Sequence, residues 1–205
     1  MLITVILFFI FRQTQLNKFN RTLSEKNKAL EKLHKKLEVA NHELQNLSFK
    51  DSLTGLYNRR YFCRYIGDEL KSLRRTPQPN CLMLLDIDLF KQVNDNFGHA
   101  VGDDVLMEIT KVFTSIIREA DIAARWGGEE FIFFLPDTTL SNAEVLAKRL
   151  VETIRQYQFA TVGQLTVSIG LAEYQENETF EDWFERTDSA LYQAKSLGRD
   201  RFVLG

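Results

Sequence analysis

The sequence predicts a layered α/β domain preceded by a long coiled-coil helix. Three observations support this fold class. Short apolar runs of strand length alternate with amphipathic helical stretches along most of the chain. The stretch Arg-Trp-Gly-Gly-Glu-Glu-Phe-Ile-Phe-Phe-Leu at residues 125–135 predicts two strands joined by a glycine turn, which places an antiparallel hairpin in the sheet. An apolar seven-residue repeat occupies residues 16–47.

Composition narrows the class of protein. At 205 residues the chain is long enough for one sizeable domain and an extension, and its 16 phenylalanines indicate a packed core rather than disorder. The net charge of −2 provides no electrostatic case for a nucleic-acid partner. The two cysteines, Cys63 and Cys81, have no paired spacing, which fits a reducing compartment and neither a disulfide nor a zinc framework.

Residues 1–11 are apolar and uncharged. As a helix they would extend about 16 Å, roughly half of a bilayer core, and no small-residue cleavage site follows them. We therefore expect the end of a transmembrane helix whose beginning is absent from this chain. The first charges, Arg12, Lys18 and Arg21, are all basic, which predicts that the rest lies at the cytoplasmic face of the membrane. The alternative is a hydrophobic N-terminal helix that packs on the domain.

Residues 12–48 are predicted to form a coiled-coil signalling helix. Seam positions recur at spacings of three and four, Glu and Lys fill the positions between them, and neither Gly nor Pro interrupts. A repeat of about four heptads favours a parallel two-stranded coiled coil, and so a homodimer; the alternative is a single amphipathic helix lying on its own domain. The seam consists of Leu16, Phe19, Leu23, Lys26, Leu30, Leu33, Leu37, Ala40, Leu44 and Leu47.

A globular domain is predicted from residue 49 onward. Gly55 ends the preceding helix, and Asn58 can cap the next one. Ser141 with Glu144 predicts a capping box at the start of a later helix. The expected helices cover residues 61–73, a short segment before Gly98, and about 103–118, 141–156 and 180–197. The expected strands cover 81–85, 123–126, 131–135, 165–172 and an edge strand at 201–204.

Acidic residues gather at two predicted strand ends. The apolar run 81–85 predicts a central strand covered on both faces, and it ends in Asp86-Ile87-Asp88, where open α/β sheets bind ligands. Gly127 and Gly128 permit positive φ and a close backbone approach, and Glu129 and Glu130 follow on opposite faces of the next strand. Adjacent carboxylates need a cation or solvent to neutralise them. The alternatives are a structural strand-end acid and a solvated hairpin tip.

Five motifs together resemble the GGDEF diguanylate cyclase family over residues 49–205. They are D-x-L-T-G-L-x-N-R-R, D-I-D-x-F-K-x-x-N-D-x-F-G-H-x-x-G-D, R-W-G-G-E-E-F, T-V-S-I-G and A-L-Y-x-A-K-x-x-G-R. The resemblance implies a palm-like domain with a mostly antiparallel central sheet flanked by helices. It also implies condensation of two GTP into cyclic di-GMP, with release of two pyrophosphates, at a homodimer interface.

The resemblance implies a metal site and a catalytic acid pair. Asp86 and Glu129, with the carbonyl of Ile87 and with Glu130, would hold Mg²⁺ or Mn²⁺, and two ions are expected. Glu129 or Glu130 would accept the proton of the attacking 3′-hydroxyl, and we favour Glu129. Such a reaction depends mainly on positioning and on neutralising phosphate charge.

The resemblance also implies a GTP site. Asn94 and Asp103 match the guanine-reading positions, and an amide with a carboxylate can pair with the edge of that base. Lys91, Lys195 and Arg199 would hold the triphosphate. The remaining expected substrate contacts are Phe90, His99, Gly127 and Gly128. For Lys195 the alternative is a solvated surface charge, and for His99 it is a cap on the turn at Gly98.

A product-inhibition site is implied by Arg118-Glu119-Ala120-Asp121, the R-x-x-D motif five residues before Gly127. Arginine can stack on guanine and bind phosphate, and aspartate can pair with the N–H edge of guanine. We expect Arg149 to complete the site from a second subunit. The alternative for Arg118 is a basic residue at a helix C-terminus, where the helix dipole favours it.

Three other functions remain in competition with a cyclase. A non-catalytic receptor would bind cyclic di-GMP at Arg118 and Asp121, but the filled Asp86 and Glu129 positions argue against it. Another palm-like nucleotidyl cyclase or polymerase would use the same acids with a different nucleotide. A purely structural coiled-coil scaffold leaves the carboxylates unexplained. Within the cyclase hypothesis, a membrane or sensor segment upstream supplies the signal.

Overall fold

The computed structural model describes residues 12–13, 15, 18, 21, 26–28, 30–36, 49–73 and 78–205. The chain divides into two units, residues 1–48 and residues 49–205. The described residues of the first unit are helical, and the side chains of Leu30 and Leu33 are exposed there. The segment 1–11 and the other apolar seam positions lie outside the described residues. Within the described part of the chain, no helix combines the length and apolar character needed to cross a bilayer.

In the described part of the second unit, six strands form one sheet in the order β1-β3-β4-β2-β5-β6. The four central strands are antiparallel to one another, whereas the edge strands β1 and β6 run parallel to β3 and β5. The expectation of a mostly antiparallel sheet is therefore confirmed. The strands are β1 Tyr57–Asn58, β2 Cys81–Ile87, β3 Ile122–Gly127, β4 Glu130–Leu135, β5 Val167–Glu173 and β6 Arg201–Leu204.

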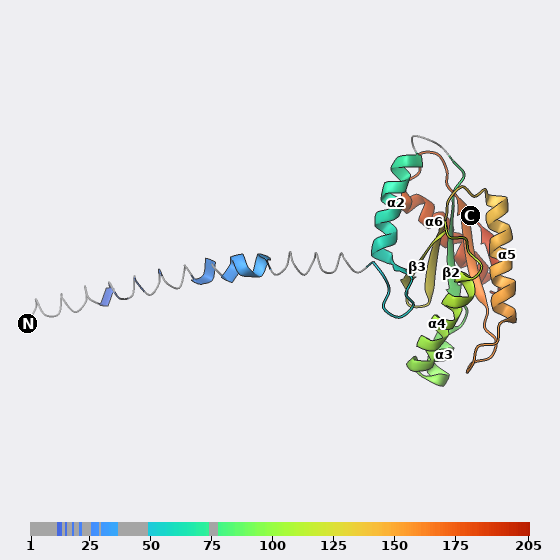
Figure 1. The fold of residues 1–205 in the computed structure, drawn as a ribbon, viewed down its shortest axis with the longest axis horizontal. Helices are drawn as coiled ribbons and strands as arrows, with labels where there is room; N and C mark the ends of the chain where they lie inside the picture. The colour runs from blue at the N-terminus through green and yellow to red at the C-terminus, as the bar shows by residue number, and fades with distance from the viewer. Residues whose placement is uncertain are drawn as a thin grey trace, which may run out of the picture. The chain divides into compact units, whose positions relative to one another are not determined.

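Helices cover both faces of this sheet, and Figure 1 shows α2 and α5 on opposite sides of it. One face packs against α2 (Arg59–Leu73) and α6 (Phe180–Ser196), and the other against α4 (His99–Thr114) and α5 (Leu140–Gln156). The short helix α3 (Phe90–Phe97) precedes α4. Every residue of β2 is buried, because alternate side chains enter two different cores. The continuous apolar run at residues 81–85 is thus a central strand, as predicted.

Glycine allows α6 to lie close to the sheet. A Cβ at Gly170 of β5 would collide with backbone atoms of Thr187 and Leu191 in α6. The neighbouring Trp183 of α6 is fully buried, and its Nε1 donates a hydrogen bond to the Ala172 carbonyl oxygen at 2.9 Å. Together these contacts fix α6, and with it the end of the helix that carries Lys195, against the strand next to β2.

One predicted helix cap is confirmed, and one capping assignment is wrong. Asn58 caps α2, where its Oδ1 accepts a hydrogen bond from the Tyr61 amide at 3.0 Å. The predicted capping box at Ser141 is absent, because Thr139 caps α5 two residues earlier. A capping box stands instead at the start of α6, where Thr179 and Asp182 bond reciprocally.

The largest boundary difference concerns α4. The helix begins at His99 rather than near residue 103, and it ends at Thr114, so Arg118 is not at a helix C-terminus as one alternative supposed. Gly98, at φ 85°, separates α3 from α4, and its amide bonds the Asn94 carbonyl oxygen at 2.9 Å. A glycine in this left-handed region lets the second helix start at once, which local sequence pattern did not reveal.

Candidate functional site

Asp86 lies near the carboxyl end of β2, beside the glycine hairpin. Its Cα pairs with that of Glu130 across the β2–β4 ladder, so the two side chains share one face of the sheet. Glu129 lies in the turn, one residue before β4 begins, and not in the strand as predicted. Its carbonyl oxygen accepts a hydrogen bond from the Ile87 amide at 3.4 Å. The structure therefore brings the two predicted acidic sites together.

The Asp86 carboxylate is mostly buried, with 10% of its side chain exposed, and its Oδ2 lies 2.8 Å from Lys195 Nζ. Burial raises the pKa of Asp86 to about 6; Lys195 opposes this rise, and the negative charges of Glu129 and Glu130 add to it. The three carboxylates therefore share one electrostatic environment that favours an added cation. Lys195 is thus part of the acidic site and not a solvated surface charge.

The donor set fits a magnesium ion that shares its coordination with a ligand. Among the described residues, no three acidic, histidine or cysteine side chains converge closely enough to enclose a metal by themselves. Mg²⁺ is usually held by one or two carboxylates, with phosphate oxygens and water completing the octahedron. Asp86 together with one hairpin glutamate meets that requirement, and the ammonium at Asp86 Oδ2 already shows that a cation is accommodated there.

Arg125 holds the glycine turn in place. Its Nε and Nη2 donate to the Gly128 carbonyl oxygen at 3.0 and 2.9 Å, and its Nη1 reaches Asp51 Oδ1 at 3.2 Å. Gly128 has φ 49°, a conformation that other residues adopt less readily. The position of Glu129 therefore depends on an arginine fork anchored outside the hairpin.

The predicted guanine-reading residues lie on α3 and the first turns of α4. A Cβ at Gly102 of α4 would overlap Asn94 Oδ1 and would lie 3.3 Å from Phe90 Cζ. The Asn94 amide therefore rests directly on the backbone of the residue before Asp103. Phe90 is buried in the core beneath it. Lys91, His99 and Asp103 are exposed, and no side-chain cap forms at the start of α4.

Asp88 holds the turn that carries Arg199. Its carboxylate is buried and accepts hydrogen bonds from the hydroxyls of Thr166 and Ser168, both at 2.7 Å, and from the Asp200 amide at 3.0 Å. Arg199 and Asp200 both have positive φ, 64° and 53°. Backbone conformations of this kind persist only where surrounding contacts impose them. Asp88, which follows β2 directly, therefore fixes the backbone of the turn that carries the exposed Arg199.

Arg118, Asp121 and Arg149 line one small cavity of about 90 Å³ between the loop before β3 and α5. Asp121 Oδ2 accepts the Arg118 amide at 2.7 Å, and Arg149 Nη2 donates to the Ile116 carbonyl oxygen at 2.7 Å. Burial raises the pKa of Asp121, and contacts with Arg118 oppose the rise. We expected Arg149 of a second subunit to complete the site, but Arg149 of this chain lines the same cavity as Arg118.

Comparison with known proteins assigns the family. The family described as "Diguanylate cyclase, GGDEF domain" matches residues 48–201. The chain belongs to the GGDEF family. Diguanylate cyclase DgcM of Escherichia coli K12 is 38% identical over 161 residues, which cover 78% of this chain and 39% of DgcM. The response regulator PleD of Caulobacter vibrioides NA1000 is 38% identical over 168 residues, covering 79% of this chain and 37% of PleD. The chain spans about two fifths of these relatives.

Solved GGDEF structures share the fold. Diguanylate cyclase SiaD of Pseudomonas aeruginosa, in complex with its activator SiaC, superposes with a TM-score of 0.74 at 36% identity, covering 94% of this chain and 80% of SiaD. The coiled coil and GGDEF domain of DgcB from Caulobacter crescentus, in complex with c-di-GMP, gives 0.75 at 27% identity, covering 91% and 99%. The resemblance found in the sequence motifs is thereby confirmed.

Four residues that support the GGDEF site were not singled out from the sequence. They are Asp51, Asp88, Gly102 and Arg125. All four stand inside the motifs that carried the resemblance, so motif membership was the available signal. Their roles depend on which groups they contact in the fold, and two of these contacts, Arg125 with Asp51 and Asp88 with Asp200, join residues far apart in the sequence.

Proposed function

We propose that the protein is a diguanylate cyclase that condenses two GTP into cyclic di-GMP and two pyrophosphates. Each 3′-hydroxyl oxygen forms a bond to the α-phosphorus of the facing GTP, and the bond from that phosphorus to pyrophosphate breaks. The observation that carries the proposal is the buried Asp86 carboxylate paired in register with Glu130 and next to the Glu129 turn. Relatives named diguanylate cyclases support it.

Each acid has a distinct part in this proposal. Two Mg²⁺ or Mn²⁺ ions would be held by Asp86, the Ile87 carbonyl, Glu129 and Glu130. When bound, these ions would neutralise charge on the phosphates. Glu129 accepts the proton of the 3′-hydroxyl, with Glu130 as the other candidate. The hydrogen bond between the Ile87 amide and the Glu129 carbonyl keeps the two metal-binding segments at a constant separation.

In this proposal different residues bind the base and the phosphates of GTP. Asn94 and Asp103 read the guanine edge, supported by the close contact between Asn94 and Gly102. Lys91, Lys195 and Arg199 hold the triphosphate. Lys195 contacts Asp86 in the free protein. If a metal replaced its ammonium group at that carboxylate, Lys195 could bind the phosphates instead.

Two half-sites must face each other for the product ring to close, because one domain binds one GTP. We propose that residues 12–48 form a homodimeric coiled coil that raises the effective concentration of the two domains. Leu30 and Leu33, seam positions with 67% and 64% exposure in the single chain, provide apolar surface for that contact. The apolar segment 1–11 and the basic residues after it place the protein, in this proposal, at the cytoplasmic face of the membrane, below an upstream sensor.

Cyclic di-GMP is proposed to inhibit the enzyme at the cavity formed by Arg118, Asp121 and Arg149. Two arginines beside a buried carboxylate can contact guanine faces, phosphates and the guanine N–H edge. The related DgcB structure was solved in complex with c-di-GMP. Binding of product there would lower turnover while leaving the acidic site intact.

The direct test is to incubate the purified protein with Mg²⁺ and each of the four nucleoside triphosphates, and to identify the products by mass. We expect cyclic di-GMP from GTP alone, and none from a variant with Glu129→Ala and Glu130→Ala. Binding of cyclic di-GMP without any turnover would instead establish a receptor. Turnover of another nucleotide would establish a different nucleotidyl cyclase.

A further inference from the structure

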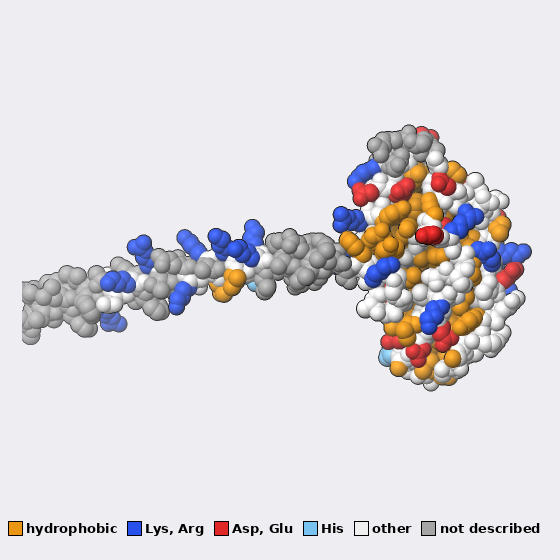
Figure 2. All heavy atoms as spheres, viewed as in Figure 1, with side chains coloured by type: hydrophobic (Ala, Val, Ile, Leu, Met, Phe, Trp, Pro, Cys, Tyr) orange, Lys and Arg blue, Asp and Glu red, His pale blue; other side chains and the backbone are white. Residues whose placement is uncertain are grey.

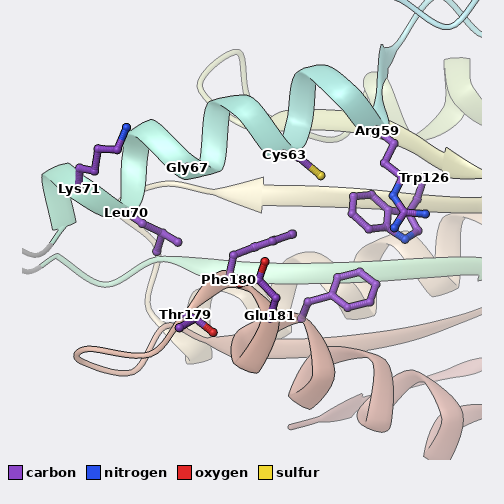
Figure 3. Close-up of a pocket in the computed structure, with 10 residues that line it drawn as sticks. Arg59, Cys63, Gly67, Leu70, Lys71, Trp126, Thr179, Phe180 and Glu181 are labelled. Atoms are coloured by element: carbon purple, nitrogen blue, oxygen red, sulfur yellow. The ribbon is translucent and has the colours of Figure 1, made fainter.

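A second cleft, separate from the acidic site and from the Arg118 cavity, lies between α2 and α6 and has a volume of about 620 Å³ (Figure 3). Its wall is aromatic: Trp126 stands at the end of β3, and Phe180 and Phe184 come from the start of α6. Their rings lie 4.9 to 6.3 Å apart between centroids and are only partly buried. Figure 2 shows hydrophobic side chains gathered on the face that α2 borders.

Gly67 in the middle of α2 has no structural reason to be glycine. Its backbone is helical, and a Cβ built there would meet no atom within 4 Å. Glycine inside a helix lowers stability by about 0.5–1 kcal/mol relative to alanine. Because Gly67 lines the cleft, its effect is to leave that wall flat and the space between the two helices open.

A cation stands at the aromatic end of the cleft. The Arg59 guanidinium lies 4.2 Å from the centre of the Trp126 ring, and Figure 3 shows Arg59 and Cys63 directed from α2 into the same space. Lys71 lines the other end of the cleft, more than two turns beyond Cys63 along α2, and Glu181 lines it from α6. Because Lys71 is paired with Asp68 at 2.8 Å, Arg59 is the cation that a negatively charged guest would meet beside the aromatic rings.

We propose that this cleft is a binding site for a small planar aromatic acid. Its rings would lie among Trp126, Phe180 and Phe184, and its carboxylate or sulfonate would pair with Arg59. The volume and the mainly apolar lining with few polar groups are those of ligand pockets. Trp126 immediately precedes Gly127, so a ligand here would contact the strand that carries the catalytic hairpin. Binding at the cleft does not depend on the proposed cyclase activity.

The test uses anilinonaphthalene sulfonate, a fluorescent planar aromatic anion, titrated against the purified protein. We expect saturable binding of one probe per chain. Gly67→Phe, which fills the cleft, should weaken binding by about tenfold or more, whereas Glu152→Phe, which places the same phenyl side chain on the exposed surface of α5, should leave it unchanged. Arg59→Met should weaken binding of the sulfonate probe but should leave binding of its uncharged analogue, N-phenylnaphthylamine, unchanged.

Cys63 provides an independent measurement that needs no variant. It lines the cleft and is exposed, whereas Cys81 is fully buried and burial raises its pKa to about 12, so a maleimide reagent should label Cys63 selectively. Saturating probe should slow this labelling several-fold, and labelled protein should no longer bind the probe. The proposed site would be overturned if Gly67→Phe bound the probe with unchanged affinity, or if saturating probe did not change the rate of Cys63 labelling. Equal affinity for the charged and uncharged probes would overturn the assignment of an acid.

Discussion

Arg125 Nη1 lies 3.2 Å from Asp51 Oδ1, and both side chains are mostly buried, with 16% and 21% of their surfaces exposed. Asp51 also accepts hydrogen bonds from the Thr54 amide at 2.9 Å and hydroxyl at 2.7 Å. Burial raises the pKa of Asp51, but the bonds from Thr54 and the charge of Arg125 outweigh it and the pKa is lowered. The loop that opens the GGDEF domain therefore anchors the arginine that holds the glycine hairpin.

Replacing Arg125 with Lys should uncouple that loop from the turn. Lysine keeps the charge but cannot contact the Gly128 carbonyl and Asp51 together in the fork geometry. We expect the kcat of cyclic di-GMP formation to fall by about ten- to a hundredfold, with a smaller change in KM, because Glu129 loses its fixed position.

The control for this variant is Asp68→Ala. It removes an ion pair with Lys71 in which both side chains are more than 70% exposed, and it should change neither activity nor the melting temperature measurably. Full activity in Arg125→Lys would show that the hairpin does not need the anchor.

The burial of Asp86 predicts a pH-dependent stability. Its pKa rises from an ordinary value of 3.8 to about 6, so between those values the folded protein keeps a proton that the unfolded chain has released. The free energy of unfolding should therefore fall as pH rises from about 4 to 6, by on the order of 3 kcal/mol from this group. Asp86→Asn should remove this decrease, abolish turnover and stabilise the protein at pH above about 7.

Chemical denaturation across that pH range measures the difference between wild type and Asp86→Asn. Asp104→Asn, an exposed change on α4, serves as the matched control. Since the prediction concerns the sign of the slope, a wild-type stability that climbs relative to Asp86→Asn through this range would contradict it.

Gly102→Ala should damage the guanine site specifically. The new methyl group would overlap Asn94 Oδ1 and displace that amide, so we expect the KM for GTP to rise by about tenfold while kcat at saturation changes less. Gly67→Ala is a matched helical control, because its methyl group meets nothing and should stabilise the protein by about 0.5–1 kcal/mol. An unchanged KM in Gly102→Ala would remove Asn94 from the substrate site.

Replacing the two arginines at the Arg118 cavity should have a different effect from replacing Asp121. Arg118→Ala should relieve the late slowing of turnover as product accumulates, and Arg149→Ala should do the same, because both side chains line the cavity proposed to bind the product and are exposed. Asp121→Ala should in addition lower stability by about 1–3 kcal/mol, since its buried carboxylate bonds the Arg118 amide. Progress curves with added cyclic di-GMP, and thermal melts, measure the two effects.

Removal of residues 1–47 tests the proposed dimer. We expect the truncated chain to lose activity at low protein concentration, because two half-sites must then meet by diffusion, and to regain it when fused to a leucine zipper. Activity per chain should be measured over a wide range of protein concentrations. Specific activity that stays constant over this range in the unfused truncation would contradict a role for the coiled coil.

Local patterns in the sequence predicted much of the fold. The run at residues 81–85, the glycine hairpin and the helix over residues 180–197 were recognised because hydrophobic periodicity and turn residues act over a few positions. The start of α4 was misplaced because the helix begins directly after Gly98 without a side-chain cap, and the cap of α5 was misplaced because several polar residues near its start can cap equally well. The two-residue strand β1 was missed, because it is defined by its pairing with β3.

By itself, the sequence determined the order of helices and strands after β1, the GGDEF family and the identity of the acids at two strand ends. The tertiary structure decided which groups hold those acids in place. Arg125 and Asp51 are 74 residues apart, and Asp88 and Asp200 are 112 apart, so no local pattern joins them. Only the folding of the sheet and its helices brings such residues within hydrogen-bonding distance, and the raised pKa of Asp86 likewise depends on the burial that this packing creates.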